Sequence, residues 1–401
     1  MRLLIFLFTV SAWAADAPTG AGLDAARLQT IRPRLQALVD SQTIPGAVAL
    51  VARHGKVALT EAVGWRDIES KKPMQANSIF QIMSMTKQFT GVAVMMLVDD
   101  GKIELRQPIE HYLPEFRGIQ VQEKFNGRGA IHAPEHPPSV WELMDHTSGL
   151  ASEPEGELAD NMRTMRVPLD EAVRMYAHTH LQFEPGARWS YSNMGIATLG
   201  RLIEVISGED YVHFVRTHIL EPLGMPDTFY FPPDDKKDRI ALVYRHTDGK
   251  LVRVGDEILA GDPTKYRQGA KYPAPEFGLY STAPDLFKFY QMLLSGGEYG
   301  GRRYLSRQAV ETMTRVFTPK VKPSGWLGGT GYGLTFEIVD QPEGTLLLHS
   351  PGTFGHGGAF GTEGWVDPKN DLVRIMLVQL ADGTADAPRS AVMQIGEAAV
   401  E

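Results

Sequence analysis

The chain has 401 residues, of which 43% are hydrophobic, and a formal net charge of -8 at pH 7. This mildly acidic balance, without a block of basic residues, argues against a nucleic-acid partner. The chain contains no cysteine, which excludes disulfides, thiolate metal sites and a cysteine nucleophile, so its stability must come from burial of a core.

The N-terminus has the pattern of a secretory signal. A positive charge at Arg2 precedes an apolar run over residues 3–10, and small residues surround a cleavage site after Ala14. We therefore expect residues 1–14 to be a signal peptide and residues 15–401 to be a mature protein in the periplasm or outside the cell. The alternative is a buried N-terminal strand. No other stretch of the sequence is long and charge-free enough to span a bilayer, so we expect no stable membrane insertion.

Strands are predicted near both ends of the chain. Two β-prone runs, Ala47 to Ala52 and Lys56 to Val63, are joined at His54-Gly55 and predict a hairpin. Four later runs are separated by Gly, Pro, Asp or Asn and predict consecutive antiparallel strands. These runs read GYGLTFEIV, TLLLHS, GGAFGTEGWVD and LVRIMLVQL.

Helices are predicted between these two groups of strands. The stretches Gly195 to Gly208 and Ala283 to Gly297 have apolar residues at helical spacing and end at glycines. The simplest architecture is an α/β (α+β) fold, in which one antiparallel sheet is built from both chain ends, is flanked by helices and receives an inserted all-helical region. We expect the sheet subdomain over about 15–83 and 275–401, and the helical subdomain over about 84–274.

The stretch QIMSMTKQFTGVAVMMLVDDG places Ser84 three residues before Lys87, at the start of a long apolar run. On a helix these two side chains share a face. A hydroxyl is a weak nucleophile until a neighbour accepts its proton, and a lysine can accept it if burial lowers its pKa below ~10.4. The alternative is that Ser84 caps a helix and Lys87 is a surface charge, and this short pattern alone arises by chance.

The stretch EPGARWSYSNMGIATLG carries Tyr191 and Asn193 directly before a helical pattern. Tyr191 could act as a general base or acid toward Ser84 once a nearby ammonium lowers its pKa, and Asn193 could hydrogen-bond a substrate amide or carbonyl. Ser or Asn before an apolar periodic run is also what a helix start requires. Capping is therefore the alternative, and both interpretations can hold together.

The stretch GTFGHGGAFGTEGWVD has His356 followed by two glycines at the start of a β run. Glycines weaken a strand and often mark a place where a ligand approaches the backbone, while a flexible loop is the alternative. Elsewhere, His178 and His180 have a possible metal-ligand spacing, but no carboxylate helix motif accompanies them. We expect these two histidines to be surface residues, and we expect no metal and no cofactor.

The ordered triplet of Ser84-x-x-Lys87, Tyr191-x-Asn193 and His356-x-Gly358 resembles the serine β-lactamase and penicillin-binding-protein superfamily, whose pattern is S-x-x-K, Y-x-N and K-T-G. The segments LMDHTSGL, FGLYSTAPDLFKFYQMLLSGG and GYGLTF are similar to connecting segments of the branch that holds the class C β-lactamases and family VIII carboxylesterases. The resemblance covers most of the mature chain. It implies a β-lactamase/transpeptidase-like fold with the site in the cleft between the sheet and the helical region.

The resemblance also implies a role for each matching residue. Ser84 would be the acylated nucleophile, Lys87 would help to deprotonate it, Tyr191 would pass the proton to the leaving group and Asn193 would orient the substrate. The backbone N–H groups of Ser84 and Ala359 would form the oxyanion hole.

The third motif departs from the superfamily pattern, because His356 stands in place of the usual lysine before Gly358, and both residues would bind substrate. A lysine there is a permanent cation facing the carboxylate of penicillins and cephalosporins. A histidine, with an ordinary pKa of ~6.5, is mostly neutral at pH 7 and would gain charge as the pH falls toward 6. Losing the cation should penalise anionic β-lactams selectively.

We therefore expect a secreted serine hydrolase that cleaves small carboxylic esters, so that its partner is a small-molecule ester or amide substrate. A class C-type β-lactamase or D-amino-acid peptidase is the alternative, and a penicillin-binding sensor that does not turn over is the third hypothesis. The sequence carries no signal for a particular oligomeric state.

Overall fold

The computed structural model describes residues 21–122, 130–156, 159–255, 267, 269–318, 325, 328–345, 348–382 and 386–401. The predicted signal peptide, residues 1–14, lies outside these residues. Among the described residues, no helix has both the length and the apolar character needed to cross a bilayer.

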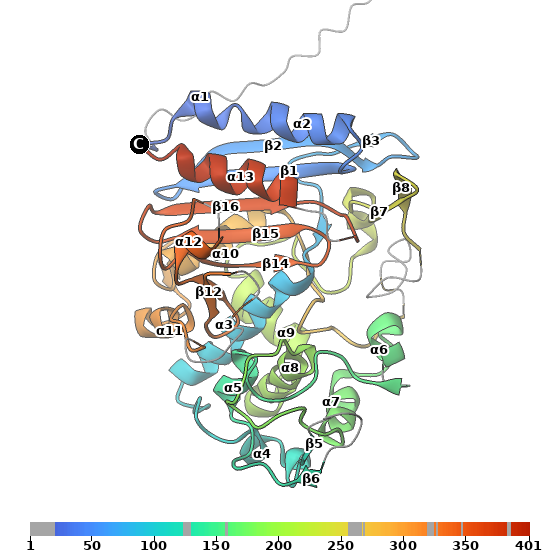
Figure 1. The fold of residues 1–401 in the computed structure, drawn as a ribbon, viewed down its shortest axis with the longest axis vertical. Coiled ribbons are helices and arrows are strands. Elements are labelled where there is room, and N and C mark those ends of the chain that lie inside the picture. The colour runs from blue at the N-terminus through green and yellow to red at the C-terminus, as the bar shows by residue number, and fades with distance from the viewer. Residues whose placement is uncertain are drawn as a thin grey trace, which may run out of the picture.

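An eight-stranded antiparallel sheet is built from both ends of the chain (Figure 1), which confirms the predicted fold class. The strand order is β12-β13-β14-β15-β16-β1-β2-β3. At its centre the N-terminal strand β1 pairs with the C-terminal strand β16, with Leu50 opposite Ile375. The bounds are β1 (Gly46–Arg53), β2 (Lys56–Asp67), β3 (Lys72–Pro73), β12 (Thr330–Tyr332), β13 (Glu337–Val339), β14 (Phe354–Gly358), β15 (Thr362–Asp367) and β16 (Leu372–Leu377).

Helices cover both faces of this sheet, which explains why β1 is apolar at nearly every position. Ala47, Ala49 and Val51 pack into one core cluster with α2 (Ile31–Asp40) and α13 (Asp386–Ala398). The alternate residues of β1 point to the other face, where the main core includes α10 (Ala283–Leu294). Figure 1 shows α13 in front of the sheet and α10 behind it, with the short α1 (Ala25–Leu28) beside α2.

The C-terminal strands differ from the prediction in three places. The run GYGLTFEIV forms two paired strands, β12 and β13, and not one. The run GGAFGTEGWVD is divided by a turn, in which the Gly361 N–H donates to the Gly358 carbonyl at 2.9 Å and Gly361 has a φ of +80°. The run therefore supplies the end of β14 and all of β15. The run TLLLHS contains no described strand, because Thr345 ends α12 (Pro342–Thr345) and residues 348–350 have no regular structure.

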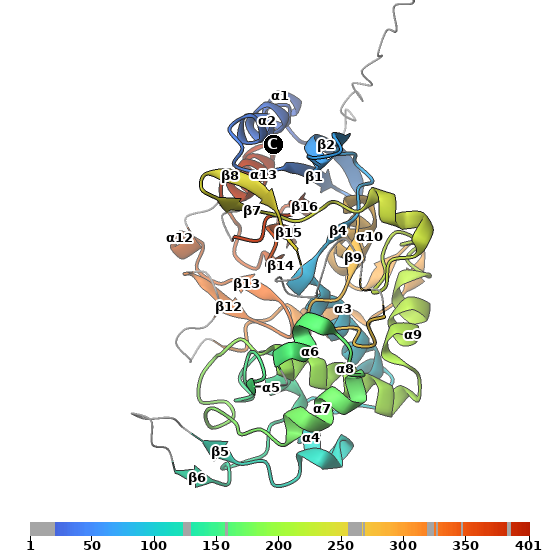
Figure 2. The same cartoon turned by 90° about the vertical axis from the view of Figure 1, so that its right-hand side faces the viewer.

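Most of the inserted region lies below the sheet in both views and is mainly helical, whereas its ribbon β7–β8 lies at the level of the sheet (Figures 1 and 2). It is not all-helical as predicted, because it also holds the two-stranded ribbons β5–β6 and β7–β8. Its helices are α3 (Thr86–Asp99), α4 (Ile109–Tyr112), α5 (Val140–Met144), α6 (Ala159–Thr164), α7 (Leu169–Ala177), α8 (Asn193–Ser207) and α9 (Tyr211–Val215). Its ribbons are β5 (Val121–Gln122) with β6 (Ile131–His132), and β7 (Tyr244–Thr247) with β8 (Lys250–Arg253).

Another ribbon joins the insert to the sheet region, because β4 (Phe80–Gln81) pairs with β9 (Tyr280–Ser281). These two strands lie close to the predicted subdomain boundaries, which themselves stay a prediction. Beyond them, the chain forms the small ribbon β10 (Glu298–Tyr299) with β11 (Arg302–Arg303), and then α11 (Arg307–Met313).

The helices α3 and α8 pack against each other at the centre of the insert. All but a few residues of α3 are buried, as expected for a helix that is apolar all round. Ser84 just before α3, Asn193 at the start of α8 and Gly358 at the end of β14 all line one cavity.

Candidate active site

Ser84 sits at an abrupt change from strand to helix. After β4, the Ile82 N–H donates to the Leu279 carbonyl at 3.0 Å, and the chain then turns through Met83, which has a φ of +49°. A positive φ is unusual for a bulky residue and stores backbone strain. The turn is held from below by Thr86, whose hydroxyl donates to the Met83 carbonyl at 2.6 Å. It presents Ser84, half-buried in the 3-10 turn Met83–Met85, at the start of α3.

Lys87 is fully buried, so it is not a surface charge. Its Nζ lies 2.7 Å from Asn193 Oδ1, 2.8 Å from the Glu276 carbonyl oxygen and 3.2 Å from Ser84 Oγ. Burial lowers the pKa of Lys87 from 10.5 to about 7, an effect that the charge of Glu276 partly opposes. Two of the three contacts are acceptors, so a neutral amine can donate two N–H bonds there and direct its lone pair at the Ser84 hydroxyl.

Tyr191 lies beside both members of this pair. Lys87 Nζ lies 4.5 Å from the centre of the Tyr191 ring, and Tyr191 lines the same cavity as Ser84. Burial raises the pKa of Tyr191 far above its ordinary value, although the nearby Ser84 side chain acts in the opposite direction. The expectation that an ammonium lowers this pKa is therefore wrong. A phenol that keeps its proton is suited to donate it, which leaves Lys87 as the group able to accept one.

In the second motif, Ser192 caps a helix and its neighbour Asn193 contacts Lys87. Ser192 is the N-cap of α8, where its hydroxyl oxygen accepts the Gly195 N–H at 2.9 Å and its O–H donates to the Ala151 carbonyl, also at 2.9 Å. The capping interpretation is thus correct for Ser192. Because Ser192 caps the helix, the amide of Asn193 is available to bind Lys87.

The third motif brings the edge of β14 against the turn that holds Ser84. A Cβ on Gly358 would lie 2.4 Å from the Ile82 carbonyl oxygen, so only glycine permits this approach. The Thr362 hydroxyl donates to the same carbonyl at 3.0 Å. Ala359 follows in the β14–β15 turn and lines one cavity together with Ser84. The two residues predicted to supply the oxyanion hole therefore border the same space.

His356 is buried and its two ring nitrogens are both occupied. Nε2 lies 2.9 Å from the Tyr332 hydroxyl, and Nδ1 lies 2.5 Å from the Gly357 carbonyl oxygen. Burial, with a smaller contribution from the charge of Lys87, lowers the pKa of His356 to about 3. The expectation that His356 gains charge near pH 6 is therefore wrong, because its imidazole is neutral at pH 6 and above.

The cavity beside Ser84 has a volume of about 530 Å³. Its one arginine, among the described lining residues, is Arg389 at the start of α13, whose Nε donates to Glu363 Oε1 at 2.8 Å. Trp365 Nε1 donates to the other oxygen of Glu363 at 2.6 Å. The full lining is Ser84, Ser152, Glu153, Tyr191, Asn193, Glu337, His356, Gly357, Gly358, Ala359, Glu363, Trp365 and Arg389. With three glutamates against one paired arginine, this wall is acidic.

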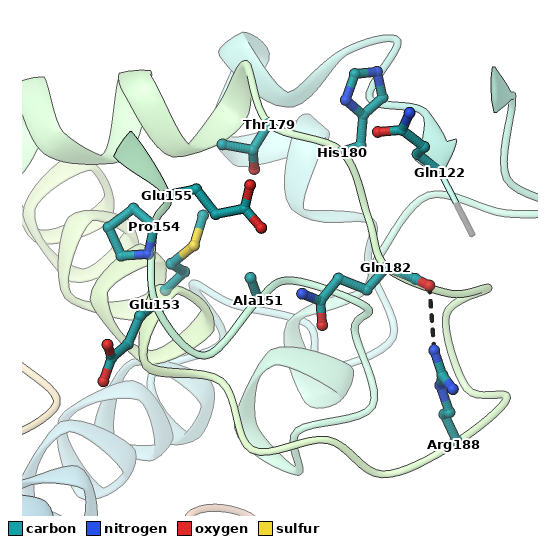
Figure 3. A pocket seen from close by; sticks show the side chains of 10 residues that line it. Gln122, Ala151, Glu153, Pro154, Glu155, Thr179, His180, Gln182 and Arg188 are labelled. Carbon is teal, nitrogen blue, oxygen red and sulfur yellow. Dashed lines mark hydrogen bonds between the residues drawn. The ribbon is translucent and has the colours of Figure 1, made fainter. Parts of the chain in front are cut away.

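A second cavity of about 350 Å³ adjoins the first, because Glu153 lines both. Figure 3 shows Glu155 and Thr179 on one side of it, with Gln182 and Arg188 on the other. His180 lines this cavity and His178 is exposed, as predicted for surface histidines. No group of three or more metal-binding side chains occurs in the part of the chain that the structure describes.

Sequence reasoning missed Glu276, which lies directly behind Lys87. It is 1% exposed, its carbonyl accepts from Lys87, and its carboxyl accepts the Tyr272 hydroxyl at 2.8 Å. Burial raises the pKa of Glu276 to about 7. The only signal was its place directly before the recognised segment FGLYSTAPDLF, since a single glutamate in a Pro-rich loop matches no motif.

Comparisons with known proteins concern the family and the fold of this chain. A family model described as Beta-lactamase matches residues 31–395. Protein Rv1367c of Mycobacterium tuberculosis is 32% identical over 364 residues, which cover 86% of this chain and 88% of that protein. Esterase EstB of Burkholderia gladioli is 28% identical over 395 residues, covering 91% and 93%. The solved structure of EstCE1, described as a hydrolase with promiscuous acyltransferase activity, has a TM-score of 0.80 at 24% identity, covers 94% of this chain and 99% of that one, and shows the shared fold.

Proposed function

Because this chain belongs to the beta-lactamase family and has the fold of its hydrolases, we propose that it is a serine hydrolase that cleaves small carboxylic esters through an acyl-enzyme on Ser84. One observation carries the proposal: Lys87 is buried, its Nζ lies 3.2 Å from Ser84 Oγ, and its pKa falls to about 7. A lysine with this pKa can accept the serine proton near neutral pH.

In the proposed reaction, neutral Lys87 takes the proton of Ser84 as Oγ attacks the ester carbonyl carbon. The N–H groups of Ser84 and Ala359 stabilise the resulting oxyanion. When the carbonyl re-forms, the C–O bond to the alcohol breaks, Tyr191 gives its proton to the leaving oxygen, and Lys87 returns a proton to Tyr191. Water then hydrolyses the acyl-enzyme with the same groups, releasing the acid and restoring Ser84.

The charge of the cavity supports a neutral ester over a β-lactam. A penicillin or cephalosporin brings a carboxylate, yet His356 is neutral and Arg389 is bound by Glu363. Glu153 and Glu337 add negative charge to the lining. The acidic wall also favours a second candidate, a D-amino-acid peptidase, because its substrate would present an ammonium group to these carboxylates.

We further propose that the reaction takes place outside the cytoplasm, which rests on the signal pattern of residues 1–14. Expression of the full chain in a bacterial host, followed by intact mass of the periplasmic fraction, tests this. A mature protein that begins at Ala15 supports export, and an uncleaved cytoplasmic product contradicts it.

The function itself is tested with three chromogenic substrates: a p-nitrophenyl acyl ester, a cephalosporin and a D-alanine p-nitroanilide. We expect turnover of the ester with the highest kcat/KM, and a transient mass increase equal to the acyl group during the reaction. Faster turnover of the cephalosporin or the anilide would replace the ester proposal by the corresponding alternative. A persistent adduct without turnover would indicate a sensor.

A further inference from the structure

His146 lies outside the three motifs, yet it is hydrogen-bonded to the chain on both sides of Tyr191. Its carbonyl accepts the Ser190 N–H at 2.9 Å, and its Nδ1 accepts the Ser192 N–H at 3.1 Å. The imidazole and Tyr191 rings lie 4.5 Å apart between centres. The residue before Tyr191, the residue after it and its ring are therefore all fixed by one side chain and its own backbone.

The backbone at His146 is built for this task. The residue has a φ of +66° and is fully buried. The turn is held by Asp145, whose Oδ1 accepts the Thr147 N–H at 3.1 Å and the Thr147 hydroxyl at 2.6 Å. A left-handed conformation at a non-glycine residue persists only where the surroundings hold it, and such residues concentrate at functional sites.

The other ring nitrogen of His146 reaches the third motif through Tyr332. His146 Nε2 lies 3.2 Å from the Tyr332 hydroxyl, which in turn lies 2.9 Å from His356 Nε2. Because Nδ1 of His146 accepts a backbone N–H, its proton is on Nε2, which donates to Tyr332. The tyrosine O–H then donates to His356, and His356 donates from Nδ1 to the Gly357 carbonyl at 2.5 Å. In this series from His146 through Tyr332 to His356, every hydrogen-bond donor has an acceptor.

We propose that His146 is a positioning residue that fixes Tyr191 and, through Tyr332, fixes His356 and the end of β14, so that the proton donor and the oxyanion side of the cavity are held together. This inference rests on the proposed function. The series of hydrogen bonds through His146 and Tyr332 joins the motif of Tyr191 and Asn193 to the motif of His356 within the buried interior.

The test removes the hydrogen bonds at Tyr332 and at His146 by substitutions that change the shape of each side chain little. Tyr332→Phe removes only the hydroxyl. His146→Asn keeps an acceptor near the position of Nδ1 for the Ser192 N–H, loses the reach to Tyr332, and tolerates the positive φ. We expect each variant to lower kcat for a p-nitrophenyl ester by about 10- to 100-fold, since a small misplacement of catalytic groups has effects of this size. KM should change by less than about twofold, and the double variant should be no worse than the poorer single variant.

Tyr244→Phe is the matched control, because that buried hydroxyl also makes two hydrogen bonds, to Glu69 and to the Ile68 N–H, far from the cavity. It should lose stability but keep kcat. Wild-type kcat in folded Tyr332→Phe and His146→Asn would overturn the proposal, as would losses that multiply in the double variant. If Ser84→Ala were also fully active, the proposed function itself would fail, which separates the two outcomes.

A second measurement needs no activity and covers the case in which a variant does not fold. ¹⁵N spectra of histidine-labelled wild type should show His146 as the Nε2–H form and His356 as the Nδ1–H form, both unchanged from pH 8 to 5.5. A charged imidazolium at either position within this range, or a proton on Nδ1 of His146, would overturn the assigned chain of donors.

Discussion

The two walls of the cavity beside Ser84 differ in how positive charge is held there. On the helical wall, Lys87 is kept, but burial lowers its pKa to about 7, so much of it is a neutral amine near neutral pH. On the sheet wall, position 356 holds a neutral histidine, and Arg389 is bound by Glu363. The helical wall holds a lysine that can accept a proton, whereas the described residues of the sheet wall offer no free cation to a substrate. A buried lysine poised to accept a proton therefore does not require a cation on the opposite wall that could bind a substrate carboxylate.

On the helical wall, the largest loss of activity is expected from a substitution of Ser84. Ser84→Ala should lower kcat by about 10⁶-fold if the nucleophile is removed. Stability should change little, because the Ser84 side chain makes no helix-cap hydrogen bond. Ester hydrolysis and thermal unfolding of the same preparation measure the two effects. A folded alanine variant that keeps most of its activity would exclude the acyl-enzyme on Ser84.

The next largest effects concern the two partners of Ser84. Lys87→Ala and Tyr191→Phe should each lower kcat by roughly 10³- to 10⁴-fold, and the double variant should be little worse than the poorer single one, because groups on one proton path are non-additive. Single-turnover kinetics with a p-nitrophenyl ester provide the measurement. Losses that multiply would show that Lys87 and Tyr191 act independently.

On the sheet wall, a positive charge at position 356 should change the substrate preference. His356→Lys should raise kcat/KM for a cephalosporin relative to a neutral ester by about five- to tenfold, equivalent to about 1 kcal/mol for a charge-assisted contact. In the wild type, the same ratio should stay constant from pH 8 to 5.5, because the pKa of His356 is about 3. A ratio that rises with acidity, or one that is unaffected by the lysine, would mean that charge at this position does not set the preference.

The smallest expected effect is on the pH dependence of the helical wall. The charge of Glu276 raises the pKa of Lys87, so Glu276→Gln should lower it and move the acid limb of kcat/KM to lower pH. A shift of about half a unit would raise the relative rate at pH 7, where Glu276 is partly ionised, about 1.5-fold. A pH–rate profile from pH 5 to 9 measures this, with Glu204→Gln as a control at a carboxyl on α8 that faces Arg201. A shift in the opposite direction would exclude this electrostatic role.

Local patterns predicted most of the site, since each motif keeps its residues within three positions of one another. Ser84 with Lys87, and Tyr191 with Asn193, were found because one helical turn or one helix start determines their relation. The structure adds that these pairs meet, with Lys87 bonded to Asn193. The likeness to a family predicted this meeting, and spacing alone did not.

The residues that the sequence did not reveal are those that act across long separations. Glu276 and His146 reach the site only after α3, α8 and the sheet are assembled, and neither lies at a spacing that a helix or strand would repeat. The missed strand boundaries have a similar cause. The run TLLLHS is apolar enough for a strand, but Pro342 begins a short helix that ends at Thr345. Proton states were the least accessible, because burial moved the pKa of Tyr191 against the expected direction.

The pairing of β1 with β16 has a consequence for how the protein is made. These adjacent central strands lie near opposite ends of the chain, so the sheet cannot close until translation has passed Leu377. Closing so long a loop is entropically costly and slow, and contacts of this kind delay folding. The N-terminal strand, apolar on both faces, must wait for β16 and α13 to cover it. Until β16 has been made, β1 lacks this strand partner, and unpaired apolar strands of this kind are prone to aggregation.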